Sequence, residues 1–167
     1  MGSNPSKFKG ADRPVENVSW EDCQEFLRKL NQSTGKRYRL PTEAEYAARS
    51  GGKKKKWAGT SSEGDLGAYA WYDKNSGSQT HPVGQKKPNG LGLYDLSGNV
   101  WEWCQDWYGD YSSAALTNPT GPSSGSNRVI RGGSWYYDAR NARAANRDWN
   151  DPGIRGENLG FRLVRSP

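Results

Sequence analysis

Two cysteines and a single histidine are the residues of this chain best suited to redox or metal chemistry. Cys23 and Cys104 lie far apart in the 167-residue sequence, and their spacing matches neither a metal-binding motif nor a disulfide framework. The two thiols could pair, but Cys23 falls on the apolar face of an expected helix, so we interpret it as a buried free thiol. His81 has no partner motif and is interpreted as structural.

Non-covalent recognition is indicated instead by the segment 131–162. Its ends, RGGSW at 131–135 and NLGFR at 158–162, have the apolar and glycine pattern of framework. Between them Tyr, Asp, Asn, Arg, Trp and Gly follow neither a helical nor a strand period. Tyr and Trp give a large contact area at low entropy cost, while Asn, Asp and Gly give hydrogen bonds and backbone freedom. We therefore predict a binding surface here.

The positive charge of the chain does not by itself indicate a nucleic-acid partner. Lys and Arg outnumber Asp and Glu by 24 to 18, which gives a net charge of +6. Much of the excess is the run 53–56 (KKKK), which follows Gly51 and Gly52 and is expected on a turn. A solvated loop tip is the favoured interpretation, because aromatic residues are not interleaved with the lysines as in single-strand binders.

Two helices are expected to position these residues. Ser19 and Asp22 form a capping-box pattern before an apolar stripe that includes Cys23, and Gly35 follows the stripe as a stop signal. Thr42 and Glu45 form a second capping box. The long region 53–90 is rich in Gly, Ser, Lys and Asn and is predicted to be structureless, which in a domain often means functional or ligand-ordered.

Strands are predicted from short apolar or alternating runs. The predicted strand segments are 92–96, 100–103, 129–130 and 159–164, with 81–84 as a further strand entry. In the second of these, Trp101 and Trp103 share one face and Glu102 points away, which requires water, a cation or an arginine beside it. We find neither a repeat nor a domain boundary and predict one loop-rich α+β domain over 1–167. No signal peptide or membrane span is found, so the chain is expected to be soluble, with its compartment and oligomeric state not encoded.

Five motifs in order resemble the formylglycine-generating enzyme (sulfatase-modifying factor) family. They are PVENVSWEDC, YRLPTEAEYAAR, GLGLYDLSGNVWEWCQDWY, RVIRGGSW and NLGFRL, and the resemblance covers about residues 4–165. It implies a variant of the C-type lectin fold, with two helices packed on short antiparallel sheets. It also implies that a further strand and helix usually precede the segment 1–10, so the chain is expected to start late.

The enzymatic activity of that family is not expected here. The resemblance implies a pair of copper-binding cysteines a few residues after the GGS motif, and soft Cu(I) requires thiolate ligands. In this chain Ser134 is followed by WYYDARN, which contains no cysteine, and Cys104 lies upstream of that position. The catalytic interpretation therefore fails on the residues.

The resemblance also implies a possible calcium site, although no cofactor is required. By motif position its ligands would be Asp95, Glu102 and the main-chain oxygens of Gly98 and Val100. The alternative is that Glu102 pairs with a nearby arginine or binds turn amides.

A second resemblance concerns residues 135–158. GGSWxxxARNxRAANRxxNxPxxRxxNLGFR resembles the variable region of target proteins of diversity-generating retroelements, which copy a template with errors confined to adenines. It implies a hypervariable region at about 135–157. The candidate ligand-binding residues are Tyr136, Tyr137, Asp138, Asn141, Asp148, Trp149, Asn150, Asp151, Gly153, Ile154, Gly156 and Glu157. The intervening Ala139, Ala142, Ala144 and Ala145 are predicted to be fixed packing positions.

Three functions compete at this stage. The favoured one is a non-catalytic module that binds an unknown ligand, expected to be a protein because such side chains form an open surface rather than a pocket. The second, in the same family, is a copper-dependent oxidoreductase, and the alternative without any of these functions is an inactive member with a fixed loop. A weaker third hypothesis is an anion or nucleic-acid binder built on the run 53–56.

Overall fold

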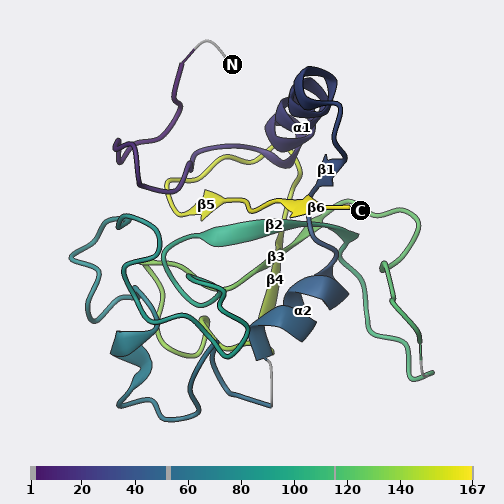
Figure 1. The fold of residues 1–167 in the computed structure, drawn as a ribbon. Coiled ribbons are helices and arrows are strands. Elements are labelled where there is room, and N and C mark those ends of the chain that lie inside the picture. The colour runs from purple at the N-terminus through teal and green to yellow at the C-terminus, as the bar shows by residue number, and fades with distance from the viewer. Residues whose placement is uncertain (1–2, 52–53, 115, 167) are drawn as a thin grey trace.

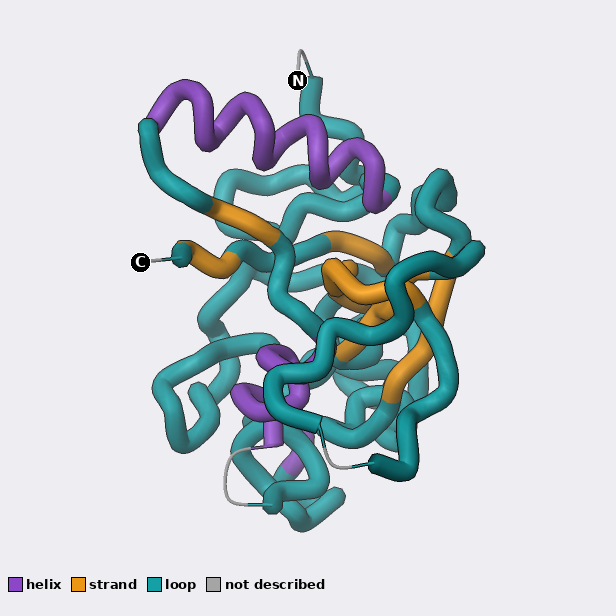
Figure 2. The backbone as a smooth tube through the Cα atoms, turned by 90° about the vertical axis from the view of Figure 1, so that its right-hand side faces the viewer, coloured by secondary structure: helices purple, strands orange, loops and turns teal. Residues whose placement is uncertain are grey.

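A four-stranded sheet divides the molecule, with helix α1 on one side and helix α2 on the other (Figure 1). The computed structural model describes residues 3–51, 54–114 and 116–166. The sheet order is β4-β3-β2-β5, and its strands are β2 (Trp101–Trp107), β3 (Arg128–Arg131), β4 (Arg147–Asn150) and β5 (Leu159–Gly160). A separate two-stranded ladder joins β1 (Tyr38–Arg39) to β6 (Val164–Arg165). Loops make up most of the tube in Figure 2.

Helix α1 (Trp20–Thr34) begins and ends where the sequence predicts. The Ser19 side chain accepts a hydrogen bond from the Asp22 N–H, and the Asp22 carboxylate accepts one from the Ser19 N–H. Gly35 ends the helix in the left-handed conformation, with φ of 66°, which glycine adopts without strain. Cys23 and Leu27 form the buried stripe.

Helix α2 (Glu43–Gly51) also has its predicted capping box. The Glu45 N–H donates to Thr42 Oγ1, and the Glu45 carboxylate accepts from the Thr42 N–H. Within residues 43–48 of the helix, Glu43 and Tyr46 are buried. The Glu43 carboxylate lies at the start of the helix, where the helix dipole favours a negative charge. It faces Arg131 of β3 and Arg147 of β4.

Two strand predictions are wrong. Residues 92–96 are irregular, because Gly92 and Asp95 have φ of 75° and 54°, which an extended strand does not allow. Residues 81–84 are also irregular. Conversely, the aperiodic run contains the unpredicted strand β4, which pairs antiparallel with β3 from Arg128↔Asn150 to Arg131↔Arg147. One sheet pair, β2 with β5, is parallel, and the predicted segment 159–164 is divided between β5 and β6.

Three apolar clusters form the core. On the α1 side of the sheet, Cys23 and Leu27 pack with Trp101, Trp103 and Ile130. On the α2 side, Tyr46 packs with Cys104 and Val129. The third, which we call the loop core, contains no residue of α1, α2 or the sheet, and consists of Trp57, Leu66, Ala70, Tyr72, Ala139 and Ala142. The region 53–90 is predicted to be structureless. Its described part, 54–90, contains one 3-10 helix at Leu66–Ala68 and isolated β-bridges at Trp57↔Thr60 and Trp71↔Gly98, and is otherwise irregular.

Candidate ligand-binding surface

The first half of the predicted variable segment, residues 135–146, lies on the loop core. Its main chain is joined to the loops of residues 54–99 by six hydrogen bonds. Donor first, they are Trp135 N to Asn99 O (2.9 Å), Ser76 Oγ to Trp135 O (2.8 Å), Asp73 N to Tyr137 O (3.1 Å), Trp57 Nε1 to Ala139 O (2.6 Å), Ser97 Oγ to Ala142 O (2.7 Å) and Ala144 N to Lys56 O (2.8 Å). Framework partners therefore fix the path of this segment.

The predicted packing role of the four alanines is correct for two of them. Ala139 and Ala142 are buried in the loop core. Ala144 is half-buried and Ala145 is exposed, because the chain turns there, with the Asn146 N–H donating to the Arg143 carbonyl. The floor of the surface therefore contains the first two alanines only.

Tyr136 and Tyr137 are exposed on this floor. Their side chains are 65% and 38% exposed, and their rings meet edge to face with centroids 5.4 Å apart. The Tyr136 ring lies edge-on against buried Trp135, and the Tyr137 ring against buried Trp101. Each tyrosine thus rests on a framework indole and leaves an aromatic edge and a hydroxyl to solvent.

Asp138 and Asn141 take part in a local turn beside the tyrosines. The Asp138 carboxylate accepts hydrogen bonds from the Asn141 side chain and from the Arg140 N–H, both at 2.9 Å. Burial acts to raise the pKa of Asp138, but these hydrogen bonds outweigh it and hold the pKa below its usual value. Both side chains stay half-exposed, and the turn presents a carboxylate to solvent.

Strand β4 presents the second group of candidates at an edge of the sheet. Trp149 pairs with Val129 of the α2 side, and it packs beside Tyr108 with ring centroids 6.1 Å apart. Asp148 pairs with Ile130 of the α1 side. Because neighbouring side chains on a strand point to opposite faces, Trp149 and Asp148 project from the two faces of this edge. Asn150 follows Asp148 on the α1 side.

The last group, residues 151–157, lies against the start of α1 and the lead-in segment before it. The Pro152 and Gly156 carbonyls accept hydrogen bonds from the Trp20 and Asn17 N–H groups, at 3.0 and 2.9 Å. Side chains add two ion pairs, Arg155 with Asp22 and Glu157 with Lys7. The Arg155 guanidinium is the main reason that the pKa of Asp22 is lowered to about 2. Within this fixed stretch Asp151, Gly153 and Ile154 are exposed.

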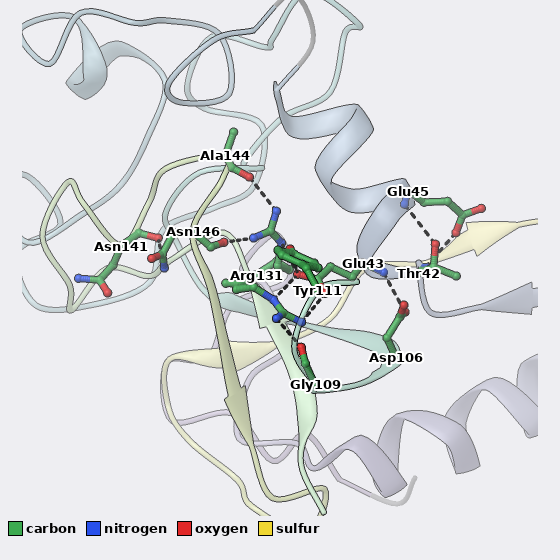
Figure 3. Close-up of polar contacts among 11 residues, drawn as sticks. Thr42, Glu43, Glu45, Asp106, Gly109, Tyr111, Arg131, Asn141, Ala144 and Asn146 are labelled. Atoms are coloured by element: carbon green, nitrogen blue, oxygen red, sulfur yellow. Dashed lines mark hydrogen bonds and ion pairs between the residues drawn. The ribbon is translucent and has the colours of Figure 1, made fainter. Parts of the chain in front are cut away.

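A buried ionic clamp connects the two halves of the segment, and Figure 3 shows it between α2 and β3. The Glu43 carboxylate accepts two hydrogen bonds from Arg147, both at 2.8 Å, and one from the Tyr111 hydroxyl at 2.9 Å. The Nε atom of Arg131 lies 3.8 Å from Oε1 of Glu43, and the Arg131 guanidinium donates hydrogen bonds to the carbonyls of Ala144 and Asn146. The clamp was not predicted. The sequence held one signal for it. Arg131 is a charged residue at the end of an apolar strand, and a buried charge there requires a partner of opposite charge.

All twelve predicted ligand-binding residues reach solvent. Seven are exposed, five are half-buried and none is buried. Two hollows of the described structure, of about 690 and 380 Å³, include none of the twelve in their linings. The twelve residues are therefore open to solvent, over the loop core, on both faces of the β4 edge and at the start of α1.

Three of the four possible calcium ligands, Asp95, Val100 and Glu102, line the smaller hollow, and Gly98 does not. Asp95 fits a cation, because its Oδ1 is buried without a hydrogen-bond partner among the described residues. Glu102 fits less well, since both of its carboxylate oxygens accept hydrogen bonds from Arg162. Gly98 and Val100 lie in the turn that leads into β2. Among the described residues no three His, Cys, Asp or Glu side chains form a metal-binding group, and calcium stays a prediction.

The two thiols are buried and unpaired. They belong to clusters on opposite sides of the sheet, Cys23 with α1 and Cys104 with Tyr46. Burial raises the pKa of both thiols, which disfavours the thiolate form that reacts or binds copper. His81 stacks on Trp71 with ring centroids 3.7 Å apart, and its Nε2 lies 2.6 Å from the Ser76 carbonyl oxygen, as expected for a structural histidine.

Comparison with known proteins places the chain by sequence and by structure. The family described as "Sulfatase-modifying factor enzyme 1-like domain" matches residues 1–167. The formylglycine-generating enzyme of Streptomyces coelicolor is 38% identical over 171 residues, which cover 92% of this chain and 52% of that enzyme. The chain thus spans about half the length of this relative.

Among solved structures, Treponema denticola variable protein 1 has a TM-score of 0.94 and 38% identity, covering 100% of this chain and 79% of that one. The Major Tropism Determinant M1 variant has a TM-score of 0.53 at 21% identity, covering 88% of this chain and 37% of that one, and it supports the fold alone. These similarities confirm the expected fold and both family resemblances drawn from the motifs.

Proposed function

The chain belongs to the sulfatase-modifying factor enzyme 1-like domain family, and we propose that it is a non-catalytic member that displays a diversified surface for binding protein ligands. The observation that carries this proposal is the arrangement of residues 135–157. Their main chain is held by framework partners, while all twelve candidate residues reach solvent. The similarity to a variable protein over the whole chain supports it.

The absence of catalysis is part of the proposal and rests on the residues. The positions after Ser134 hold Trp135 and two tyrosines, and neither of the two cysteines of the chain lies near them in sequence. Burial and raised thiol pKa values make Cys23 and Cys104 poor replacements for a copper-binding pair. The proposed function requires no cofactor, and calcium at Asp95 would act only as a structural ion.

A protein ligand follows from the shape of the surface. Small molecules are usually bound in concave pockets that cover most of their area, whereas protein partners bind open patches with aromatic anchors. Tyr136, Tyr137 and Trp149 are the anchors in this proposal. No helix among the described residues is long and apolar enough to cross a bilayer, so nothing in those helices opposes a role as a displayed binding module.

The ligand surface can be tested with a Y136A/Y137A/W149A variant. Each replacement is at an exposed side chain, so we expect a change in unfolding free energy of about 0.5 kcal/mol or less per residue. A 12-residue peptide selected on the wild type from a random displayed library should bind the variant about 30-fold more weakly or worse, as loss of a hot spot predicts. Urea denaturation and fluorescence anisotropy give the two readouts.

Trp103→Ala is the matched control for that variant. Trp103 is fully buried and its indole N–H donates to the Val18 carbonyl, so its loss should cost about 3–5 kcal/mol of stability. If the triple variant unfolds as easily as Trp103→Ala, its aromatics belong to the core and the proposal fails.

Diversification has its own test in the neighbouring DNA. A near-copy of codons 131–162 with AAC at the candidate positions, beside a reverse transcriptase gene, is expected.

A further inference from the structure

A group of cations lies next to the exposed tyrosines, and we call Lys54, Lys55, Lys56, Arg140 and Arg143 the basic rim. The two parts of the rim are far apart in sequence but adjacent in space. The Ala144 N–H donates to the Lys56 carbonyl at 2.8 Å, and the Trp57 indole donates to the Ala139 carbonyl at 2.6 Å. The turn at 140–143 therefore lies over residues 56–57 and carries its arginines beside the lysines.

The rim is exposed and largely unneutralised. All five side chains are exposed, and Arg140 is 81% exposed. Asp138 pairs with Arg140, and no carboxylate among the described residues forms an ion pair with the other four cations. Lys53 lies outside the described residues. Five cations facing one carboxylate create a positive potential beside the ligand surface, which attracts acidic groups and repels basic ones.

The rings around the rim fit a protein partner better than a nucleic acid. Trp57 is buried with its indole N–H occupied, so it offers no face for a base to stack on. Tyr136 and Tyr137 meet edge to face with an interplanar angle of 87°, which differs from the parallel platforms on which bases stack. The large exposed apolar side chains of the described chain lie outside 54–61 and 139–146, which disfavours insertion into a lipid surface.

We propose that the basic rim is a constant part of the ligand surface and selects protein partners that carry an acidic patch beside the contact made by Tyr136 and Tyr137. This inference rests on the proposed function. None of the five rim residues is among the positions predicted to vary, so every version of the surface keeps the same positive rim. The variable side chains then discriminate among acidic partners, and the rim raises their association rate.

The test uses the whole chain and a displayed library of random 12-residue peptides with equal frequencies of acidic and basic residues. Selections on the wild type should enrich peptides with a net negative charge. K54S/K55S/K56S should lose this bias and bind a wild-type-selected acidic peptide about tenfold more weakly at low salt, with a shallower dependence on salt. K9S/K29S/K36S removes three exposed lysines elsewhere and should change the affinity less than about twofold.

Each other outcome has a definite meaning. If the wild type selects charge-neutral peptides whose binding still requires Tyr136 and Tyr137, the proposal of a basic rim is wrong and the proposed function stands. If both lysine variants lose affinity for the acidic peptide to the same extent, the effect comes from the net charge of the chain, and the proposal of a basic rim is wrong. A 20-base-pair DNA duplex that binds the rim more tightly than the selected peptide assigns it to nucleic acid instead. Acidic peptides whose affinity is unchanged in Y136A/Y137A refute the proposed function, and the rim then binds acidic groups without being part of that ligand surface.

Discussion

The ligand surface rests on two floors that are built differently. Residues 135–146 lie on the loop core, where indole, hydroxyl and amide groups of a long irregular region hold the main chain. Residues 147–157 lie on regular structure, with β4 in the ladder of β3 and the following stretch against the start of α1. A sheet supplies its own hydrogen bonds, whereas a loop floor requires a specific donor for each position.

This difference explains how a region with almost no regular structure can support the ligand surface. Residues 54–90 bury Trp57, Leu66, Ala70 and Tyr72, which pack with Ala139 and Ala142 beneath residues 135–146. The loop floor is therefore expected to be the more sensitive to substitution, because its contacts depend on particular side chains. The β4 edge depends on main-chain pairing and tolerates more changes.

Trp57→Ala should have the largest effect. It removes the central side chain of the loop core and the donor to the Ala139 carbonyl, and we expect a loss of about 3–5 kcal/mol in unfolding free energy by urea denaturation. Trp149→Ala, at a 48% exposed tryptophan of the other floor, should cost about 0.5 kcal/mol. Equal losses in the two variants would erase the contrast between the floors.

Gly133→Ala should have an intermediate effect. Gly133 has φ of 73°, and an added Cβ would lie 2.8 Å from the main-chain N and Cα of Ala142, so the loop floor must shift. We expect a loss of about 1–3 kcal/mol, measured in the same way. Gly77→Ala is the control, because Gly77 has a similar φ of 59° with nothing within 4 Å of an added Cβ. If Gly133→Ala loses no more unfolding free energy than Gly77→Ala, the close contact between residue 133 and Ala142 does not affect stability.

Arg155→Ser should have the smallest effect and tests the second floor. The Arg155 guanidinium holds the pKa of Asp22 near 2, below its usual 3.8. The ion pair therefore contributes its full stabilisation at pH values above 3.8, and this contribution is lost as the pH falls through about 2. Both partners are substantially exposed, so the difference should stay below that of Gly133→Ala. Melting curves of wild type and variant should differ slightly at pH 6 and coincide near pH 1.5. A gap that persists at pH 1.5 contradicts an ionic origin.

The local elements of this fold could be predicted because their signals are local. The capping boxes at Ser19 and Thr42 and the stop at Gly35 are set by residues a few positions apart, and all three are confirmed. The ordered motifs likewise predicted the family and its fold. The exposed aromatic residues were recognisable from composition, although their roles in binding stay predictions.

The missed features all depend on long-range contacts. Strand β4 has a polar, aperiodic sequence and is a strand because it pairs with β3. The Glu43 clamp joins residues about a hundred positions apart. The false strand at 92–96 has an apolar pattern, but Leu93 forms hydrogen bonds with Asn89, and the positive φ of Asp95 prevents an extended path. Periodicity carries none of this information.

One property of the loop floor bears on how large a repertoire this domain can support. Four of its six anchoring bonds to residues 135–146 end on carbonyl oxygens, those of Trp135, Tyr137, Ala139 and Ala142. A carbonyl is common to all twenty amino acids, proline included, whereas proline lacks the amide hydrogen. At Tyr137, a position expected to vary, the anchor is therefore indifferent to which residue the codon specifies. Any residue that replaces Tyr137 can still accept the bond from Asp73, so few members of a randomised population should be lost to misfolding at this position.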